Sequence, residues 1–328
     1  MMHFSRRRLL LTPVLSAAAI TTSPWVRAQT FPDRQITLVV PAPPGGTADI
    51  AARALQEPLG KALGQTVVID NKGGANGIVA AQATLAAKPD GHTLLMAFSG
   101  FNAMTPHLVK LPYDPMKDIQ PVCNVYVAPQ VLVVRSSLDQ IKTVQDLISY
   151  AKNNPGKLNY ASAGNGSVQH IAAELFKSVT GTFITHIPYR GTGPMVTDLL
   201  AGQVDMVLTT APPLMPHIQS GRFRALMVAA RKRLSTLPNV LTADQVGLKN
   251  FEVASWFALY THGQAPRSAV DRIATEVQKI MATAAFRERA ASQGAEAAYL
   301  DPIQMQAFAA VEFSRWGKVI KNAGIKAD

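Results

Sequence analysis

The sequence has a single cysteine, Cys123, in 328 residues, so the chain alone has no disulfide and no CxxC pair of thiolates for zinc or redox chemistry. Charged residues make up only 16% of the chain, whereas hydrophobic residues make up 48%. No segment is of low complexity. This balance excludes a generally disordered chain and predicts a packed globular body. A mass of 35.1 kDa is enough for roughly two domains with ample core.

Several motifs of catalysis are also missing. The sequence contains no G-x-S-x-G elbow, no H-E-x-x-H and no Gly-Lys-Ser/Thr, and Gly164-x-Gly166 lacks the third glycine of G-x-G-x-x-G. His170 follows a glycine loop, where it is either a hydrogen-bonded residue near a helix cap, a ligand contact or a catalytic base. The apolar neighbours of Cys123 predict a buried thiol rather than a nucleophile.

No apolar run reaches the ~20 residues that a membrane-spanning helix needs. Residues 1–28 have the pattern of a signal peptide, with basic HFSRRR at 3–8, an apolar stretch at 9–20 and a small-residue cleavage site before Gln29. The three arginines fit a Sec signal or a twin-arginine signal. We therefore expect export to the periplasm and a mature protein that does not span the membrane.

The chain has an excess of positive charge, but it is scattered. The formal net charge is +11, and removal of the four arginines of residues 1–28 would leave +7. Beyond residue 28 the densest basic cluster, 231–233, has no interleaved aromatic residues, so we expect no nucleic-acid partner. A general attraction of anions agrees with this charge.

Runs rich in Val and Ile alternate with Ala- and Leu-rich segments of helical spacing. The pattern predicts strands at 36–40, 66–69, 92–97, 131–134, 159–161, 183–187, 204–209, 223–229 and 254–260. It predicts helices at 47–63, 77–87, 143–153, 168–179, 194–201, 268–283, 285–292 and 302–323. Residues 98–121 are expected to be irregular. The alternation indicates an α/β fold in which mainly parallel sheets are flanked by helices.

The two α/β halves have a similar order of elements, and the C-terminal helices are left over. We therefore predict two lobes: lobe 1 is discontinuous, comprising 29–130 and 256–328, and lobe 2 comprises 131–255. The segments 129–135 and 255–261 would cross between the lobes and act as a hinge beneath a cleft.

Three loops follow predicted strands and open predicted helices, at 41–49, 160–167 and 188–194. Their glycines allow backbone N–H groups to approach a ligand at the positive end of a helix. A plain strand-to-helix turn is the alternative for each loop alone. Because several such loops follow strands in both halves, the pattern favours an anion site in the cleft.

Three segments together resemble a known family: PAPPGGTADIAAR at 41–53, YASAGNGSVQHIAAELF at 160–176 and HIPYRGTGPMVTDLLAGQVD at 186–205. They are similar to the Bug family, the TctC-like periplasmic receptors associated with tripartite tricarboxylate transporters, over essentially the whole mature chain. The resemblance implies a two-lobed type II periplasmic-binding-protein (Venus flytrap) fold. It also implies a receptor, not an enzyme, that captures a small mono-, di- or tricarboxylate for uptake or sensing. A secreted enzyme that acts on a small carboxylate is the alternative function. A membrane transporter or sensor is the implied protein partner; we expect a monomer with no cofactor and no metal.

The resemblance places the ligand contacts in the loops that follow the strands of both lobes. The implied residues are Ala42, Pro43, Gly45, Gly46, Ser99, Asn102, Ser162, Gly164, Gly166, Ser167, Gln169, His170, Tyr189, Thr209 and Asp205. Because a carboxylate beside an anion would repel it, we interpret Asp49 as a charge of the first helical turn and Asp205 as a structural or water-holding acid.

Overall fold

The computed structural model describes residues 1, 31–322 and 324–326. The predicted signal peptide, apart from Met1, lies outside these residues. The strands are β1 (Ile36–Val40), β2 (Val67–Asn71), β3 (Thr93–Phe98), β4 (Ile119–Arg135), β5 (Asn159–Ser162), β6 (Thr185–Pro188), β7 (Met206–Thr210), β8 (Phe223–Val228), β9 (Ala254–His262) and β10 (Glu296–Leu300). The α-helices are α1 (Thr47–Leu63), α2 (Ile78–Leu85), α3 (Val144–Asn153), α4 (Val168–Thr180), α5 (Thr192–Leu200), α6 (Met215–Gln219), α7 (Arg267–Ala282), α8 (Ala284–Ser292) and α9 (Pro302–Asn322).

Local signals in the sequence explain where several helices begin and end. Helix α3 begins with a capping box, in which the Thr143 hydroxyl accepts from the Asp146 N–H and the Asp146 carboxylate accepts from the Thr143 N–H. Helix α1 ends at Gly64, which has a φ of 69° and so adopts the left-handed conformation that favours glycine. The predicted bounds of α1 are confirmed.

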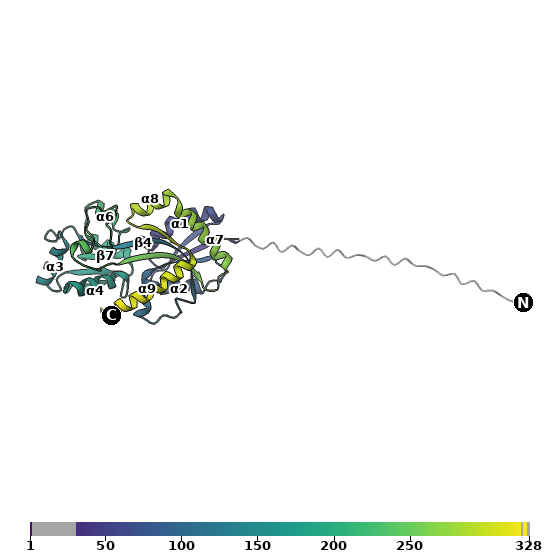
Figure 1. Cartoon of the computed structure of the whole chain (residues 1–328), viewed down its shortest axis with the longest axis horizontal. Helices are drawn as coiled ribbons and strands as arrows, with labels where there is room; N and C mark the ends of the chain where they lie inside the picture. The colour runs from purple at the N-terminus through teal and green to yellow at the C-terminus, as the bar shows by residue number, and fades with distance from the viewer. Residues whose placement is uncertain (2–30, 323, 327–328) are drawn as a thin grey trace. The chain divides into compact units, whose positions relative to one another are not determined.

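Ten strands form a sheet with the path β2-β1-β3-β9-β4-β7-β5-β6, and β8 and β10 also pair with β4. We call the part built around β1, β2, β3 and β10 the first lobe, and the part built around β5 to β8 the second lobe. The strand β4 pairs with β9 and β10 over its first part and with β7 and β8 over its last part, so it belongs to both lobes. Figure 1 shows helices on both sides of these strands.

The α/β two-lobed fold is confirmed, but the sheets are mixed rather than mainly parallel. β1 is parallel to β2 and β3, and β5 is parallel to β6 and β7. The strands β4 and β9 run in opposite directions, and each is antiparallel to the neighbours with which it pairs. The parallel pairs are the strand–helix–strand units that the sequence predicts, whereas the strands that link the lobes add the antiparallel pairs.

The first part of β4 corrects the sequence prediction, which treats 98–121 as irregular and begins a strand only at residue 131. The pairing of β4 with β9 shifts register between Pro121 and Cys123, and again between Asn124 and Tyr126. These irregularities remove the strict alternation by which a strand is recognised, and proline is usually a sign against one. The predicted lobe boundaries at 130/131 and 255/256 remain predictions.

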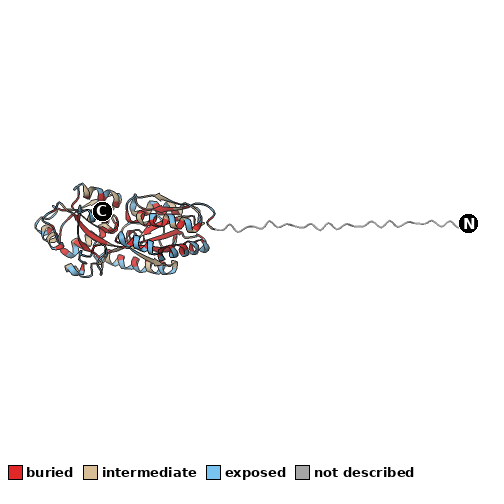
Figure 2. Ribbon diagram, turned by 90° about the horizontal axis from the view of Figure 1, so that it is seen from above, coloured by how far each residue is buried: buried red, intermediate tan, exposed pale blue. Residues whose placement is uncertain are grey.

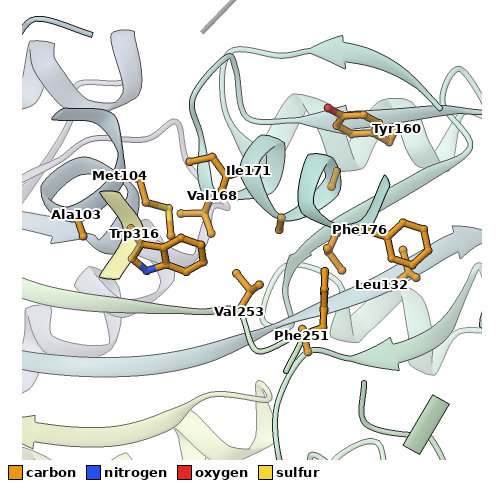
Figure 3. Close-up of a cluster of buried hydrophobic side chains, with 14 of the residues drawn as sticks. Ala103, Met104, Leu132, Tyr160, Val168, Ile171, Phe176, Phe251, Val253 and Trp316 are labelled. Carbon is orange, nitrogen blue, oxygen red and sulfur yellow. The ribbon is translucent and has the colours of Figure 1, made fainter. Parts of the chain in front are cut away.

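The core of the molecule follows the strands, which Figure 2 shows as buried between more exposed helices. Cys123 is fully buried, as predicted, and burial raises the pKa of its thiol well above the usual range. One apolar cluster contains residues of both lobes: Met104 and Trp316 belong to the same cluster as Val168 and Ile171 (Figure 3). The lobes therefore share apolar packing where the second-lobe helix α4 begins. Among the described residues, no helix is long and apolar enough to span a membrane.

Candidate ligand-binding site

A cavity of about 350 Å³ lies where loops of both lobes meet. Loops after β1 and β2 and the ends of β3 and β9 form one side, and loops after β5, β6 and β7 form the other. Carboxyl ends of parallel strands meet at one edge of a sheet, so the fold brings these loops together. The lining residues are Pro41, Ala42, Pro43, Gly46, Thr47, Ala48, Gly74, Ala75, Asn76, Gly77, Phe98, Ala163, Gly164, Asn165, Ser167, Val168, Gln169, Tyr189, Arg190, Gly191, Thr192, Thr210, Ser255 and Phe257.

Three helices, α1, α4 and α5, begin at this cavity. The first N–H groups of a helix have no partner within the helix and carry a partial positive charge. At α1 the cap is Gly46, which offers no side chain to those groups, and at α5 the cap is Gly191. The cavity therefore presents backbone donors from both lobes, an arrangement suited to a negatively charged ligand.

A buried carboxylate holds the first-lobe loop from behind. Asp49, which is 2% exposed, accepts hydrogen bonds from the Gly45 N–H (3.0 Å), Arg53 Nε (2.9 Å) and Asn71 Nδ2 (3.0 Å). Burial alone would raise the pKa of this carboxyl group, but the hydrogen bonds from Arg53, Gly45 and Asn71 outweigh burial and hold the pKa below its ordinary value. Asp49 therefore lies in the first turn of α1, as expected, and its carboxylate holds the loop at Gly45.

The second-lobe loop is held by its own side chains and two stacked imidazoles. Ser162 Oγ lies 2.6 Å from His186 Nε2 and accepts from the Gly164 N–H at 3.1 Å. His170 Nδ1 accepts from the Gly166 N–H at 3.1 Å, and the rings of His170 and His186 stack with their centroids 4.4 Å apart. These bonds fix the path of the glycine loop before α4.

The side chains of the second lobe also form a network on the cavity wall. Gln169 Nε2 donates to Thr209 Oγ1 at 3.1 Å and to Thr192 Oγ1 at 3.3 Å. Tyr189 donates its hydroxyl to Asp198 Oδ2 at 2.8 Å. Burial and this bond to Asp198 raise the pKa of Tyr189 to about 12, so its phenol is neutral at physiological pH.

The two lobes contact each other directly around the cavity. Thr47 Oγ1 and Thr210 Oγ1 lie 2.6 Å apart, and both residues are buried. Asn76 Nδ2 donates to the backbone oxygen of Asn165. Gly191 lies so close to the first lobe that a Cβ placed on it would be 2.7 Å from Pro43 Cδ. The structure is therefore a closed arrangement of the two lobes.

The structure brings seven of the predicted site residues to the cavity wall: Ala42, Pro43, Gly46, Gly164, Ser167, Gln169 and Tyr189. Four others lie outside the lining and form hydrogen bonds that support the lining loops: Ser162, Gly166, His170 and Thr209. Gly45 also lies outside the lining, and its N–H is occupied by Asp49. The prediction that the Gly45 amide faces the ligand is thus corrected: the amide points to the carboxylate that pins its loop.

Ser99, Asn102 and Asp205 also lie outside the lining, and the reason is where they lie relative to the ends of β3 and β7. Ser99 and Asn102 are buried in the turn that follows Phe98, whereas Phe98 itself faces the cavity. Asp205 precedes β7 and so lies at the opposite edge of the sheet. Its carboxylate accepts from Arg135 Nε and Nη2 at 3.0 Å each and from the Asn159 N–H at 3.0 Å. This geometry agrees with the interpretation of Asp205 as a hydrogen-bonded structural acid. It does not agree with the prediction that Asp205 contacts the ligand.

Sequence reasoning missed part of the wall. The turn 74–77 after β2 lines the cavity, and its signal is the same as that of 41–49: a glycine-rich turn at the carboxyl end of a parallel strand. Phe98 and Phe257, which pair directly across β3 and β9, form an apolar wall for which the sequence carries no local signal. The wall also contains Arg190, Thr192 and Thr210, which lie beside predicted contacts in the same loops.

The charge of the lining favours an anion. Arg190 is the one charged side chain among the lining residues, and no aspartate or glutamate is among them. In the part of the chain that the structure describes, no group of three or more His, Cys, Asp or Glu residues could hold a metal ion. The chemistry available to the cavity is therefore hydrogen bonding and charge, from helix N-termini, hydroxyl groups and one guanidinium.

Residues 51–325 match the family described as "Tripartite tricarboxylate transporter family receptor". The chain belongs to this family. The receptor is also 34% identical over 326 residues to Protein BugT of Bordetella pertussis, an alignment that covers 98% of each chain. The predicted resemblance to Bug and TctC receptors is thereby confirmed.

Solved structures agree with this receptor family. A protein of R. palustris, solved with adipate, is similar with a TM-score of 0.87 and 36% identity, covering 90% of this chain and 99% of the other. MatC from Rhodopseudomonas palustris, with bound malate, is similar with a TM-score of 0.83 and 32% identity, covering 88% of this chain and all of the other. This receptor thus has the fold of periplasmic solute-binding proteins, and two of its structural relatives hold carboxylates.

Proposed function

We propose that the protein is an exported receptor that captures a small carboxylate in the cavity between its lobes. It would present this ligand to a membrane transporter or a sensor protein. One observation carries the proposal: helices of both lobes begin at one cavity whose lining has no acidic side chain. The adipate and malate held by the two structural relatives support a carboxylate as the ligand.

Calorimetry with matched acids and amides tests the ligand class. Adipate and malate are to be compared with their neutral diamides, which keep the carbon skeleton but lose the charge and bring N–H groups against N–H donors. We expect an acid to bind and its amide to bind at least about tenfold more weakly, because charge-assisted hydrogen bonds are roughly twice as strong as neutral ones. Equal affinity for acid and amide would overturn the anion site. Native mass spectrometry of freshly purified protein would identify an acid retained from the cell.

The alternative function, an enzyme acting on a small carboxylate, is separated by the fate of the ligand. A receptor returns the acid unchanged after prolonged incubation, whereas an enzyme consumes it. Recovery of the bound acid by mass spectrometry decides between the two, and a product that accumulates with time would reject the receptor.

Closure of the lobes about segments 129–135 and 255–261 is part of the proposal. A ligand that touches both lobes favours the closed state over an open one. Small-angle scattering should therefore show a more compact protein on binding, and identical profiles with and without bound acid would contradict closure unless the free protein is already closed.

Export is tested separately by intact mass. The mature protein should begin within a few residues of Gln29 and occur in the periplasmic fraction. Full-length protein in the cytoplasm alone would overturn this assignment.

A further inference from the structure

The lining of the cavity has one charged side chain, and none of the residues that the structure describes forms a hydrogen bond or ion pair with it. Arg190 lines the cavity, and it makes no hydrogen bond or ion pair with any residue in 31–322 or 324–326. Other arginines are committed: Arg53 pairs with Asp49, Arg135 with Asp205 and Arg231 with Glu252. A guanidinium presents several N–H donors in a rigid fork that fits a carboxylate. Arg190 is therefore free to receive an anionic group of a ligand.

Residues on both sides of Arg190 fix its backbone at the edge of the cavity. The hydroxyl of Tyr189 is bonded to Asp198, at 2.8 Å. Gly191, with a φ of 109°, packs against Pro43 of the first lobe. Because both neighbours are anchored, the side chain starts from a defined place in the closed arrangement.

The cavity has polar groups at its buried end and at its solvent-exposed end. Gly46, Thr47 and Ser167, at the starts of α1 and α4, are buried. Arg190 is exposed, so it stands at the outer end of the same cavity. Phe98, Val168 and Phe257 supply apolar lining, which suits a hydrocarbon segment.

We propose that Arg190 forms an outer subsite for a second anionic group and so makes the receptor prefer doubly charged acids over singly charged ones. This inference rests on the proposed function. One carboxylate would bind the buried helix N-termini, the hydrocarbon would lie against the apolar lining, and the second carboxylate would meet the guanidinium. A hydrophobic monocarboxylate would make only the first two of these contacts, with the helix N-termini and with the apolar lining.

The test compares adipate with hexanoate, which has the same carbon chain and one carboxylate. The variants are Arg190→Gln and Arg190→Lys. Arg289→Gln is the control, because Arg289 is also exposed, forms no ion pair among the described residues and lies outside the lining. Calorimetry gives the two dissociation constants for each protein, at low and at high salt.

We expect wild type to prefer adipate. Arg190→Gln should weaken adipate binding by about tenfold and change hexanoate binding by less than about twofold, because only adipate loses a charge-assisted hydrogen bond. Arg190→Lys should fall between, since it keeps the charge and loses the fork. Arg289→Gln should alter neither acid. The preference for adipate should also decrease at high salt.

Three results overturn the inference alone: an equal effect of Arg190→Gln on both acids, no effect on either acid while both bind, and equal affinity of the wild type for the two acids. A wild type that binds neither acid and no other carboxylate overturns the proposed function, and the outer subsite with it.

Discussion

The first-lobe loop at 41–49 and the second-lobe loop at 160–170 face the same cavity, but they are held in different ways. The first loop ends at a helix whose glycine cap leaves the N–H groups of the first turn open, and a single buried carboxylate, Asp49, fixes it from behind. The second loop closes on itself: Ser167 caps α4 by accepting from the His170 N–H, and Ser162 bonds within the loop. Two loops that each join a strand to a helix can therefore differ in how they are held and in which N–H groups they leave open to a ligand.

This difference shows where each lobe obtains its donors. The first lobe offers backbone amides that are held at one anchor, so its binding strength depends on that anchor. The second lobe spreads its support over hydroxyls, imidazoles and the Gln169 amide, and it adds one charged side-chain donor, Arg190, to the lining. We expect single substitutions to damage the first loop more than the second.

The largest effect is expected for Asp49→Asn. The change removes the charge that accepts from three donors in a buried site, so the free energy of unfolding should fall by about 2 kcal/mol. Ligand affinity should fall as well, because the loop that carries the α1 amides loses its anchor. Urea unfolding and calorimetry measure the two effects. Arg53→Gln is the control. It removes the half-exposed partner of the same ion pair and should lower the free energy of unfolding by less than about 1 kcal/mol. Equal losses for both variants would contradict a role for Asp49 beyond its ion pair.

The contact between the lobes is tested by a pair of glycines that differ in their surroundings. Gly45 and Gly191 both have positive φ, 86° and 109°, so alanine is strained at each. A Cβ at Gly45 meets nothing within 4 Å, whereas a Cβ at Gly191 meets Pro43 of the other lobe at 2.7 Å.

Gly191→Ala should therefore weaken ligand binding by about tenfold, since the clash exists only when the lobes meet and strain of this kind costs a few kcal/mol at most. Gly45→Ala should lower the free energy of unfolding and leave affinity nearly unchanged. Calorimetry on the two variants decides the point, and an equal loss of affinity in both would show that loop strain, not closure, controls binding.

A smaller effect is expected for the hydroxyl pair that joins the lobes. Thr47→Val and Thr210→Val each remove one member of the 2.6 Å contact while keeping the shape of the side chain. Each should weaken binding by roughly fivefold, which corresponds to the ~1 kcal/mol of one buried hydrogen bond. The double variant should bind about as well as either single variant, because the contact is lost only once. Additive losses would mean that each hydroxyl binds the ligand independently.

Much of the fold was predictable, because the strand–helix alternation is encoded locally. The helix at 47–63 has a regular apolar face and a glycine just past its end, and it was predicted to the residue. The first part of β4 was not predicted, because register shifts near Pro121 and Asn124 hide its alternation. Its strand structure comes from pairing with β9, more than a hundred residues later in the chain.

The site was predictable at the level of loops but not of atoms. Glycine-rich segments after strands identify 41–49 and 160–167, yet no local pattern shows that the Gly45 amide is taken by Asp49 or that Ser162 is taken by His186. Phe98 and Phe257 meet only through the pairing of β3 with β9. Asp205 is close in sequence to Thr209, but it precedes β7 and so lies at the far edge of the sheet from the cavity.

The smallest effect is expected for a second-lobe carboxylate that serves as the counterpart of Asp49. Glu174 accepts from Tyr160 Oη and from Lys177 Nζ, at 2.6 Å each, and lies outside the cavity lining. Burial would raise the pKa of this carboxyl group, but the bonds from Lys177 and Tyr160 outweigh burial and hold the pKa below its ordinary value of 4.5.

Glu174→Gln should therefore lower the free energy of unfolding by no more than about 1 kcal/mol near neutral pH and leave ligand affinity unchanged. Because the pKa of Glu174 is lower in the folded state than in the unfolded state, its contribution is fully present above pH 4.5 and is lost as the pH falls through the folded value. Urea unfolding of wild type and variant at decreasing pH should show a constant gap down to about pH 5 and a shrinking gap below it. A gap that stays constant into strong acid, or one that widens there, would show that packing rather than charge stabilises this part of the second lobe. The same series on Asp49→Asn should show a larger difference in the free energy of unfolding at neutral pH. This follows if Asp49 stabilises the first-lobe loop more than Glu174 stabilises the second lobe.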